Sequence, residues 1–355
     1  MYANGITLIF ESTNVRKNMS IKQIAKIAGV STATVSRVLN GSDKVKNETI
    51  EQVQKVAKKL NYQRNNVARR MKVKATESLI FGLVVSDINN PFFADIARGV
   101  EEFAYAKEHV IFICNTNESP EKEIFFLNSM ISEKVSGVII APTAGNYQLF
   151  DKLVSDRLPL VLIDRLKNSF PFDTVSINNE KGAFLAVQRL IQNGHKRIGI
   201  INGIKGLSNS EARFRGYKNA LGEAGLPLIK ELITYGHFRE AGGREAMKKL
   251  LDLKKPPTAV FSANNLMTLG CIKEIHEQNL SIPDQIALIG FDDSTWAEAL
   301  TPPLTTVKQP GYELGVNAAE LLYKRLKNKD SNIMNVVLNP ELIIRDSCGT
   351  NRKSS

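Results

Sequence analysis

The chain has 355 residues, 43% of them hydrophobic and 23% charged, a balance that excludes a disordered or fibrous protein. No apolar run reaches the roughly 18 residues of a membrane span, and MYANGITLIF lacks the regions of a secretory signal. The cysteines, Cys114, Cys271 and Cys348, are too few and too widely spaced for a disulfide or zinc framework. We therefore expect a cytoplasmic globular protein, long enough for two or three compact units.

The net charge of +11 is distributed unevenly along the chain. Residues 1–75 hold 15 Lys and Arg against 4 Asp and Glu, whereas the remaining 280 residues hold 32 of each. A solvated basic face explains most charged segments, but it does not explain why one segment carries the whole imbalance. This distribution is typical of a phosphate-binding head joined to a neutral body.

Residues 1–18 match no pattern in the chain that follows, so we expect an extension outside the fold. Met19 is then either the initiator residue or the point where a loose extension joins the folded chain. A regular helical pattern begins two residues later, at Ile21.

The segment from Ile21 to Gly41 has the spacing of a helix-turn-helix. Gly29 permits a left-handed turn between two short helices, and Ser31 is a suitable N-cap for the second helix. That helix directs its valines inward, which leaves a face of hydroxyls, a methyl group and a guanidinium. Such a face suits base edges in the major groove of DNA, although an ordinary helical hairpin with a polar face shares the pattern. The helical spacing of the first helix is set by Ile21, Ile24, Ala25 and Ala28.

A third amphipathic helix, capped near Asn47, is predicted by the apolar spacing of Ile50, Val53, Val56, Ala57 and Leu60. Residues 63–76 follow, with five basic side chains and only three apolar side chains at helical spacing. That apolar strip is too small to bury a stable helix alone. We therefore expect this linker to become ordered only when it contacts a partner.

From Leu79 onward, continuous apolar runs alternate with helical stretches. This alternation predicts strands buried on both faces, as in an open parallel α/β sheet. The series restarts at Arg197, which favours two similar doubly wound lobes over one very wide sheet. Ligands bind outside the carboxyl ends of such strands, so we expect the site in the cleft between the lobes. The runs are LIFGLVV, VIFIC, GVIIAP, LVLID, RIGIING, TAVFSAN and IALIGFD.

The motifs of common enzymes on doubly wound sheets do not occur. The sequence contains neither G-x-G-x-x-G after a strand nor G-x-x-x-x-G-K-[ST]. The histidines, His109, His195, His237 and His276, have no spacing typical of metal ligands or of a nucleophile and its base. We therefore expect no enzymatic activity, no metal and no cofactor.

Three motifs in order resemble those of the lactose-repressor (LacI/GalR) family of bacterial transcription regulators. VSTATVSRVLNG is similar to the family's recognition helix, LNYQRNNVARRM to its hinge and GFDDSTWAEALTPPLTTVKQP to its late motif. The resemblance implies a small all-α helix-turn-helix headpiece and a periplasmic-binding-protein-like α/β body of two doubly wound lobes. It also implies a homodimeric repressor that binds a palindromic operator in double-stranded DNA. A small sugar-like effector in the cleft would control this repressor of a carbohydrate-utilisation operon.

The resemblance runs from Met19 to about Ser347 and divides the chain into five parts. They are an extension at 1–18, the headpiece at 19–62, the hinge linker at 63–76, the effector-binding and dimerisation domain at 77–348, and a tail at 349–355.

Thr32, Ala33 and Arg37 are the predicted base readers of the second helix. Ser31, Thr34 and Ser36 are predicted to position the DNA backbone, and Asn40 is a further predicted DNA contact.

In the hinge, the resemblance implies that Arg69 and Met71 contact DNA. Met71 stands where the family usually has a leucine wedge for the minor groove, a task that methionine can also perform. Arg64 replaces the usual proline, which adds a phosphate-seeking charge and removes a rigid helix start.

The body further resembles periplasmic sugar-binding proteins of the ribose-binding type, which implies an effector pocket of aromatic and polar side chains. Aromatic faces suit the C–H surfaces of a sugar, while carboxylates, amides and guanidinium groups pair its hydroxyls. The implied residues are Asn90, Phe92, Phe93, Asp164, Arg165, Arg213, Phe238, Asn264, Asp292 and Gln309. Trp296 either adds a wall to this pocket or serves a core or an interface.

Two alternatives share parts of this pattern. A global carbon-catabolite regulator, controlled by a phosphorylated carrier protein, has the same architecture. A sugar-binding protein without a DNA role has a similar body but would not need the basic head.

Overall fold

The computed structural model describes residues 21–39, 45–60, 78–143, 158–165, 172–328 and 331–349. The chain divides into two compact units, residues 1–77 and 78–355, which we call the head and the body. The predicted extension and hinge linker lie outside the described residues, as do the predicted DNA contacts Asn40, Arg69 and Met71.

The described part of the head consists of three helices, α1 (Ile21–Ile27), α2 (Thr32–Leu39) and α3 (Asn47–Lys59). Gly29 has a φ of 61°, the left-handed conformation predicted for the turn between α1 and α2. Each helix contributes a fully buried side chain to one small core, namely Ile24, Val35 and Val53. The side-chain cap predicted near Asn47 does not form, because Lys46 occupies the N-cap position of α3 without a capping hydrogen bond.

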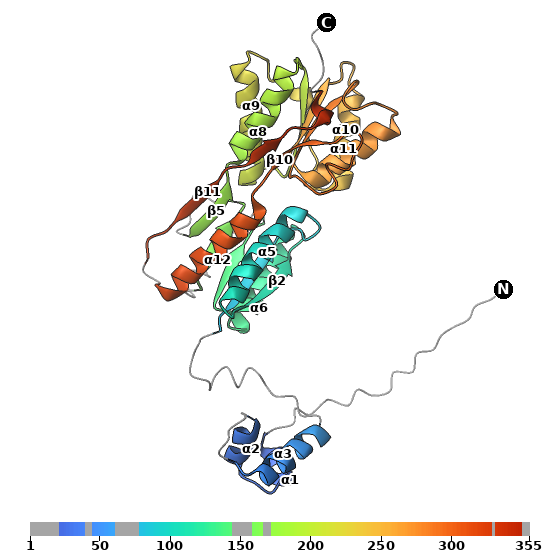
Figure 1. Cartoon of the computed structure of the whole chain (residues 1–355). Helices are drawn as coiled ribbons and strands as arrows, with labels where there is room; N and C mark the ends of the chain where they lie inside the picture. The colour runs from blue at the N-terminus through green and yellow to red at the C-terminus, as the bar shows by residue number, and fades with distance from the viewer. Residues whose placement is uncertain are drawn as a thin grey trace, which may run out of the picture. The chain divides into compact units, whose positions relative to one another are not determined.

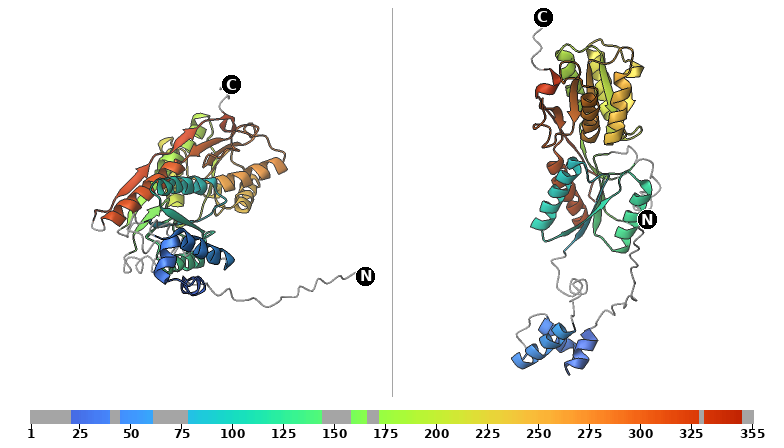
Figure 2. Two further views of the ribbon diagram at one scale, coloured as in Figure 1. Left: turned by 60° about the horizontal axis from the view of Figure 1, so that its bottom comes forward. Right: turned by 90° about the vertical axis from the view of Figure 1, so that its right-hand side faces the viewer.

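The first lobe of the body is built on a six-stranded sheet in the order β11-β5-β4-β3-β1-β2 (Figure 1). Phe81 and Leu83 of β1 pack with α5 and α12, whereas Val84 packs with α6. Figure 2 shows α5 and α12 on one face of this sheet and α6 on the other. Helices therefore cover both faces, which explains the continuous apolar runs of the sequence. The strands, all paired in parallel, are β1 (Ile80–Val85), β2 (Val110–Asn115), β3 (Gly137–Ile140), β4 (Leu160–Ile163), β5 (Asp173–Ile177) and β11 (Asn335–Leu338). The helices are α5 (Pro91–Ala106), α6 (Pro120–Ser132) and α12 (Gly311–Lys327).

The second lobe has a sheet in the order β12-β10-β9-β8-β6-β7, with α8 and α9 on one face and α10 and α11 on the other (Figure 1). The pairing of β12 with β10 is antiparallel, and the other pairings described in this sheet are parallel. The strands are β6 (Ile198–Asn202), β7 (Ile233–Tyr235), β8 (Ala259–Ser262), β9 (Ala287–Phe291), β10 (Thr305–Lys308) and β12 (Glu341–Ile343). The helices are α8 (Asn179–Gln192), α9 (Ser208–Glu223), α10 (Glu240–Leu251) and α11 (Asn265–Glu277).

The lobes are not consecutive segments of the chain. The chain crosses from β5 to α8, returns from β10 to α12, and crosses again from β11 to β12. The lobe boundary therefore precedes α8, although the strand series restarts only at Arg197. As a result, α12 and β11 belong to the first lobe but follow all strands of the second-lobe sheet except β12 in the sequence.

Glycines allow α5 and α12 to cross with their backbones in contact. A Cβ on Gly99 would lie 2.2 Å from the carbonyl oxygen of Tyr312, and a Cβ on Gly315 would lie 2.2 Å from that of Ile96. This crossing closes the first lobe over the face that carries Phe81 and Leu83. In the described part of the chain, no helix combines the length and apolarity needed to cross a membrane.

Candidate functional site

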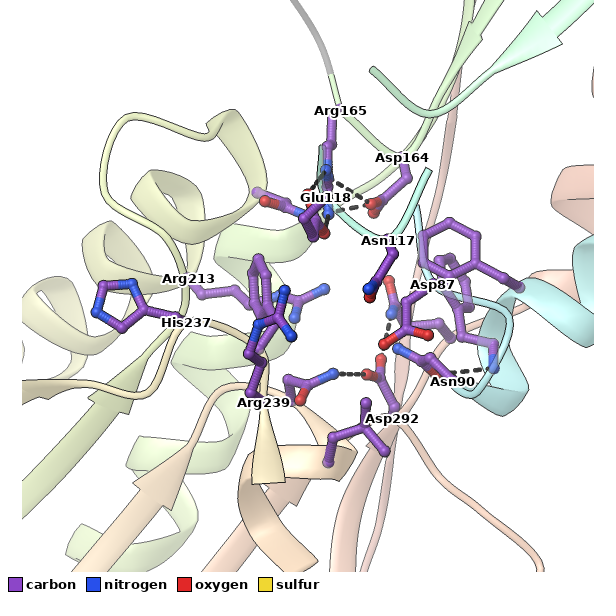
Figure 3. A pocket seen from close by; sticks show the side chains of 17 residues that line it. Asp87, Asn90, Asn117, Glu118, Asp164, Arg165, Arg213, His237, Arg239 and Asp292 are labelled. Carbon is purple, nitrogen blue, oxygen red and sulfur yellow. Dashed lines mark hydrogen bonds and ion pairs between the residues drawn. The ribbon is translucent and has the colours of Figure 1, made fainter. Parts of the chain in front are cut away.

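A pocket lies between the two lobes, at the carboxyl ends of their strands, with an empty volume of about 480 Å³ that includes its open mouth (Figure 3). The first lobe contributes the segments after β1, β2 and β4, and the second lobe those after β6, β7, β8, β9 and β10. The structure brings together all ten residues that the sequence predicted for an effector pocket. These are Asn90, Phe92, Phe93, Asp164, Arg165, Arg213, Phe238, Asn264, Asp292 and Gln309.

Seven further residues line the same pocket and were missed in the sequence. His237 and Arg239 flank the predicted Phe238, while Asn117 and Glu118 follow β2, a strand end for which no site residue was predicted. Their position directly after a strand was the available signal, because every parallel strand of a lobe ends at the same edge of its sheet. The other three are Asp87, Asn209 and Leu266.

The aromatic wall begins at the N-terminus of α5. The side-chain oxygen of Asn90 accepts a hydrogen bond from the backbone nitrogen of Phe92 at 3.0 Å and so caps the helix. The rings of Phe92 and Phe93 lie 5.3 Å apart, and both belong to the core of the first lobe as well as to the pocket. The pair therefore packs in the core of the first lobe and lines the pocket at the same time.

Phe238 forms the opposing aromatic surface on the second lobe. His237 and Phe238 both have positive φ, 55° and 57°, a conformation that side chains with a Cβ adopt at a cost. The ring lies against the end of β6, where a Cβ on Gly203 would be 2.1 Å from the Cζ atom of Phe238. The missing side chain at Gly203 thus makes room for this ring.

Asp164 lines the pocket, 4% exposed and with a φ of 60°. Its Oδ2 atom accepts a hydrogen bond from Asn209 at 3.0 Å and lies 3.4 Å from Nε of Arg165. Within the described residues, its Oδ1 atom is buried and has no hydrogen-bond partner. Burial raises the pKa of Asp164, and the positive charges of Arg165 and Arg213 oppose that rise.

The guanidinium of Arg165 is already engaged by the protein. Nη1 and Nη2 donate to the two carboxylate oxygens of Glu118 at 2.8 and 2.5 Å, and Nη1 also donates to the carbonyl oxygen of Pro142 at 3.1 Å. Burial lowers the pKa of Arg165, but Glu118 and Asp164 together raise it above its usual value. These three bonds use three of the five N–H donors of Arg165, which also lines the pocket.

Arg213 is also held in place, but less completely. Its Nε donates to Asn179 at 2.7 Å and its Nη1 to the carbonyl oxygen of Ala263 at 2.5 Å. The guanidinium carbon lies 3.8 Å from the ring centroid of Phe291, a cation–π contact in a buried setting. Burial lowers the pKa of Arg213. These two bonds leave Nη2 for a ligand.

A network of amides holds Asp292, whose φ is 73°. Gln309 donates to Oδ1 of Asp292, and Asn264 donates to Oδ2 at 3.3 Å. The side-chain oxygen of Gln309 is buried and, among the described residues, lacks a hydrogen-bond partner. Asn265 extends the network across the cleft, because its Nδ2 donates to the side-chain oxygen of Asn90 at 2.9 Å.

Trp296 does not line the pocket. It packs, partly buried, against the core of the second lobe. Of the two roles predicted for it, the structure therefore favours packing.

On the head, α2 presents the predicted DNA contacts. Thr32, Ala33 and Arg37 are exposed, whereas Val35 and Val38 are buried beneath them. Ser31 caps α2, because its Oγ accepts a hydrogen bond from the backbone nitrogen of Thr34 at 3.0 Å. The Ser31 and Thr34 hydroxyls lie 2.9 Å apart, and Ser36 is partly exposed on the same helix.

A helix-turn-helix head with an exposed polar recognition face, joined to a two-lobed body with a polar cleft, defines a DNA-binding regulator of the ligand-responsive class. Residues 20–65 match the profile of bacterial regulatory proteins of the lacI family, and residues 187–348 match that of a periplasmic binding protein-like domain. The chain therefore belongs to the LacI family. It is a DNA-binding regulatory protein and not an enzyme.

Similarity to known proteins extends over nearly the whole chain. The HTH-type transcriptional repressor PurR of Histophilus somni is 38% identical over 332 residues, covering 93% of this chain and 99% of that protein. The ribose operon repressor of Haemophilus influenzae is 37% identical, covering 92% of this chain and 98% of that protein. Among solved structures, a complex of the transcriptional regulator CelR with cellobiose is 31% identical, with a TM-score of 0.69 over 93% of this chain and 99% of that one.

Proposed function

We propose that this protein is a cytoplasmic, homodimeric repressor of carbohydrate-utilisation genes, controlled by a small neutral sugar in the pocket between its lobes. Residues 19–62 would bind each half of a palindromic operator, and residues 63–76 would couple the head to the effector-binding domain at 77–348. The names of the ribose operon repressor and of the cellobiose-bound regulator support a sugar as the ligand.

The observation that carries the sugar proposal is the pair of buried acceptors without partners. Oδ1 of Asp164 and Oε1 of Gln309 have no hydrogen-bond partner among the described residues. Buried acceptors of this kind are few in native proteins, because each costs about 1–3 kcal/mol. A ligand with several hydroxyl groups would donate to both acceptors and place its C–H faces on Phe92 and Phe238.

The charges of the pocket support a neutral ligand. Four carboxylates, those of Asp87, Glu118, Asp164 and Asp292, face three guanidinium groups, those of Arg165, Arg213 and Arg239. A ligand with a full negative charge would add to an existing excess of carboxylates.

The effector half of the proposal is tested by thermal shift and calorimetry with neutral pentoses, hexoses and disaccharides. We expect Asp292→Ala and Arg213→Ala to abolish the shift while retaining DNA binding. Arg215→Ala is the matched control, because Arg215 lies two residues along α9 and pairs with Glu180 outside the pocket. Normal sugar responses in both pocket variants would show that the effector binds elsewhere.

The DNA half is tested on an operator selected in vitro from random double-stranded DNA. Arg37→Ala is expected to weaken operator binding by about 1–3 kcal/mol and to relax its sequence preference. Lys55→Ala, an exposed change on α3, is the control. Equal losses on operator and random DNA would assign Arg37 to the phosphate backbone instead.

A further inference from the structure

The pocket wall contains a buried guanidinium, that of Arg165, whose partner is a carboxylate of the protein itself. The two groups pair in the geometry expected for a guanidinium and an anionic ligand. Arg165 is 4% exposed, and its two terminal nitrogens meet the two carboxylate oxygens of Glu118 side by side. This bidentate fork is the geometry in which arginine recognises a free carboxylate or phosphate. Both residues line the pocket (Figure 3).

Glu118 is placed for this contact by its loop. Asn117 and Glu118, between β2 and α6, both have positive φ, 51° and 59°. The backbone nitrogen of Glu118 donates to the carbonyl oxygen of Ser86 at 3.1 Å, which ties the loop to the end of β1. The carboxylate is thus held on Arg165 by a fixed backbone, and its side chain is only 13% exposed.

Removing the Glu118 charge would leave the two terminal nitrogens of the buried Arg165 guanidinium without their carboxylate partner in the pocket wall. Asp164 lies beside Nε of Arg165 at 3.4 Å and would remain its neighbour, whereas Glu118 pairs with the two terminal nitrogens. The two terminal nitrogens would lose their carboxylate partner in a buried setting, so Arg165 would then gain by pairing them with an anionic group on a ligand. With Glu118 present, the same anionic group would meet a carboxylate instead.

We propose that Glu118 determines the charge selectivity of the pocket: it occupies Arg165 and so makes the protein select neutral sugars over sugars that carry a carboxylate or phosphate. This inference rests on the proposed sugar-binding function and names a residue that controls it. It differs from a purely structural ion pair, which would affect stability without changing the class of ligand.

The test compares wild type with Glu118→Gln in the full-length protein, by thermal shift and calorimetry. The probes are matched neutral and anionic pairs: ribose with ribose 5-phosphate, glucose with glucuronate, and galactose with galacturonate. Glutamine retains an oxygen that accepts from Arg165 but removes the charge. Glu121→Gln is the matched control, since it removes the same charge three residues away on an exposed side chain outside the pocket.

We expect wild type and Glu121→Gln to bind the neutral sugar of a pair and to show no binding of the anionic sugar. Glu118→Gln changes a residue that lines the pocket, so its own affinity for the neutral sugar is measured as the reference for the anionic sugar. This variant is expected to gain at least about tenfold in affinity for the anionic sugar, as a charge-assisted hydrogen bond predicts. If Glu118→Gln is less stable, the thermal shift still reports the gain, because a bound anion raises the melting temperature by mass action.

Three outcomes would overturn the inference. If wild type binds a neutral sugar but Glu118→Gln gains no anion binding, the ion pair is structural and the proposed sugar function stands. If wild type binds neutral and anionic partners equally, Glu118 exerts no selection, and again the sugar function stands. If wild type binds no sugar in the panel, both the inference and the proposed function fail.

Discussion

Asp164 and Asp292 hold left-handed backbone conformations directly after β4 and β9, the central strands that point into the cleft from the two lobes. Such conformations cost on the order of 1–3 kcal/mol each for residues other than glycine. Both side chains are buried and both line the pocket. The strain therefore coincides with the two carboxylates best placed to bind hydroxyl groups, which supports a functional rather than a structural reason for it.

Glu123 gives a prediction for the pH dependence of stability. It is fully buried in α6, its Oε2 accepts from the backbone nitrogen of Thr143 at 2.6 Å, and its Oε1 lacks a hydrogen-bond partner among the described residues. Burial raises its pKa above the usual 4.5. The folded state then holds this proton more tightly than the unfolded state, so the Glu123 contribution to stability falls as the pH rises above about 4.5.

We expect Glu123→Gln to remove this component and to become more stable relative to wild type as the pH increases. Urea unfolding at several values between pH 4.5 and 7.5 measures the difference. Glu133→Gln, at the exposed end of the same helix, is the control. A difference that is constant with pH would mean that the folded and unfolded states bind the Glu123 proton equally.

At the scale of elements, the crossing of α5 and α12 depends on two glycines. Gly99→Ala or Gly315→Ala would place a methyl group 2.2 Å from a backbone carbonyl oxygen of the other helix. Backbone cannot move aside as a flexible side chain can, so each change is expected to destabilise the body by about 1–3 kcal/mol. The control is Gly222→Ala in α9, where a Cβ meets nothing within 4 Å. Chemical unfolding that shows equal stability in all three variants would contradict the tight crossing.

At the scale of the whole body, two hydrogen bonds between described residues join the lobes across the pocket. Asn265 donates to Asn90 at 2.9 Å, and Asn209 donates to Asp164 at 3.0 Å. Each bond contributes on the order of 1 kcal/mol to closure of the cleft. The three chain crossings keep the lobes attached, so the loss of these bonds would open the cleft without separating the lobes.

We therefore expect Asn265→Ala and Asn209→Ala to weaken sugar binding by about five- to tenfold, because less of the protein occupies the closed form. Small-angle scattering of the ligand-free variants is expected to show a larger radius of gyration than wild type. Asn219→Ala removes a hydrogen bond to Glu180 within the second lobe and serves as control. An unchanged radius together with unchanged affinity would show that these bonds do not hold the lobes closed.

The sequence by itself determined the class of each part of this protein. The spacing around Gly29, the charge confined to residues 1–75 and the alternation of apolar runs with helices are local properties, and local sterics and burial act on them directly. The resemblance to sugar-binding proteins of the ribose-binding type also pointed to ten residues that the structure brings to one pocket. Nine of them follow a strand or begin a helix, so their place at one sheet edge follows from the parallel topology, whereas Arg213 lies within α9.

Only the tertiary structure decided how these residues are used. The pairing of Arg165 with Glu118 joins residues 47 positions apart, and no pattern in the sequence links the end of β2 with the end of β4. The return of α12 and β11 to the first lobe likewise depends on packing, since glycines at 99 and 315 act only when two distant helices cross. Hydrogen bonds and close contacts are short-range forces, so which polar groups remain available to a ligand depends on atoms that only the folded chain brings together.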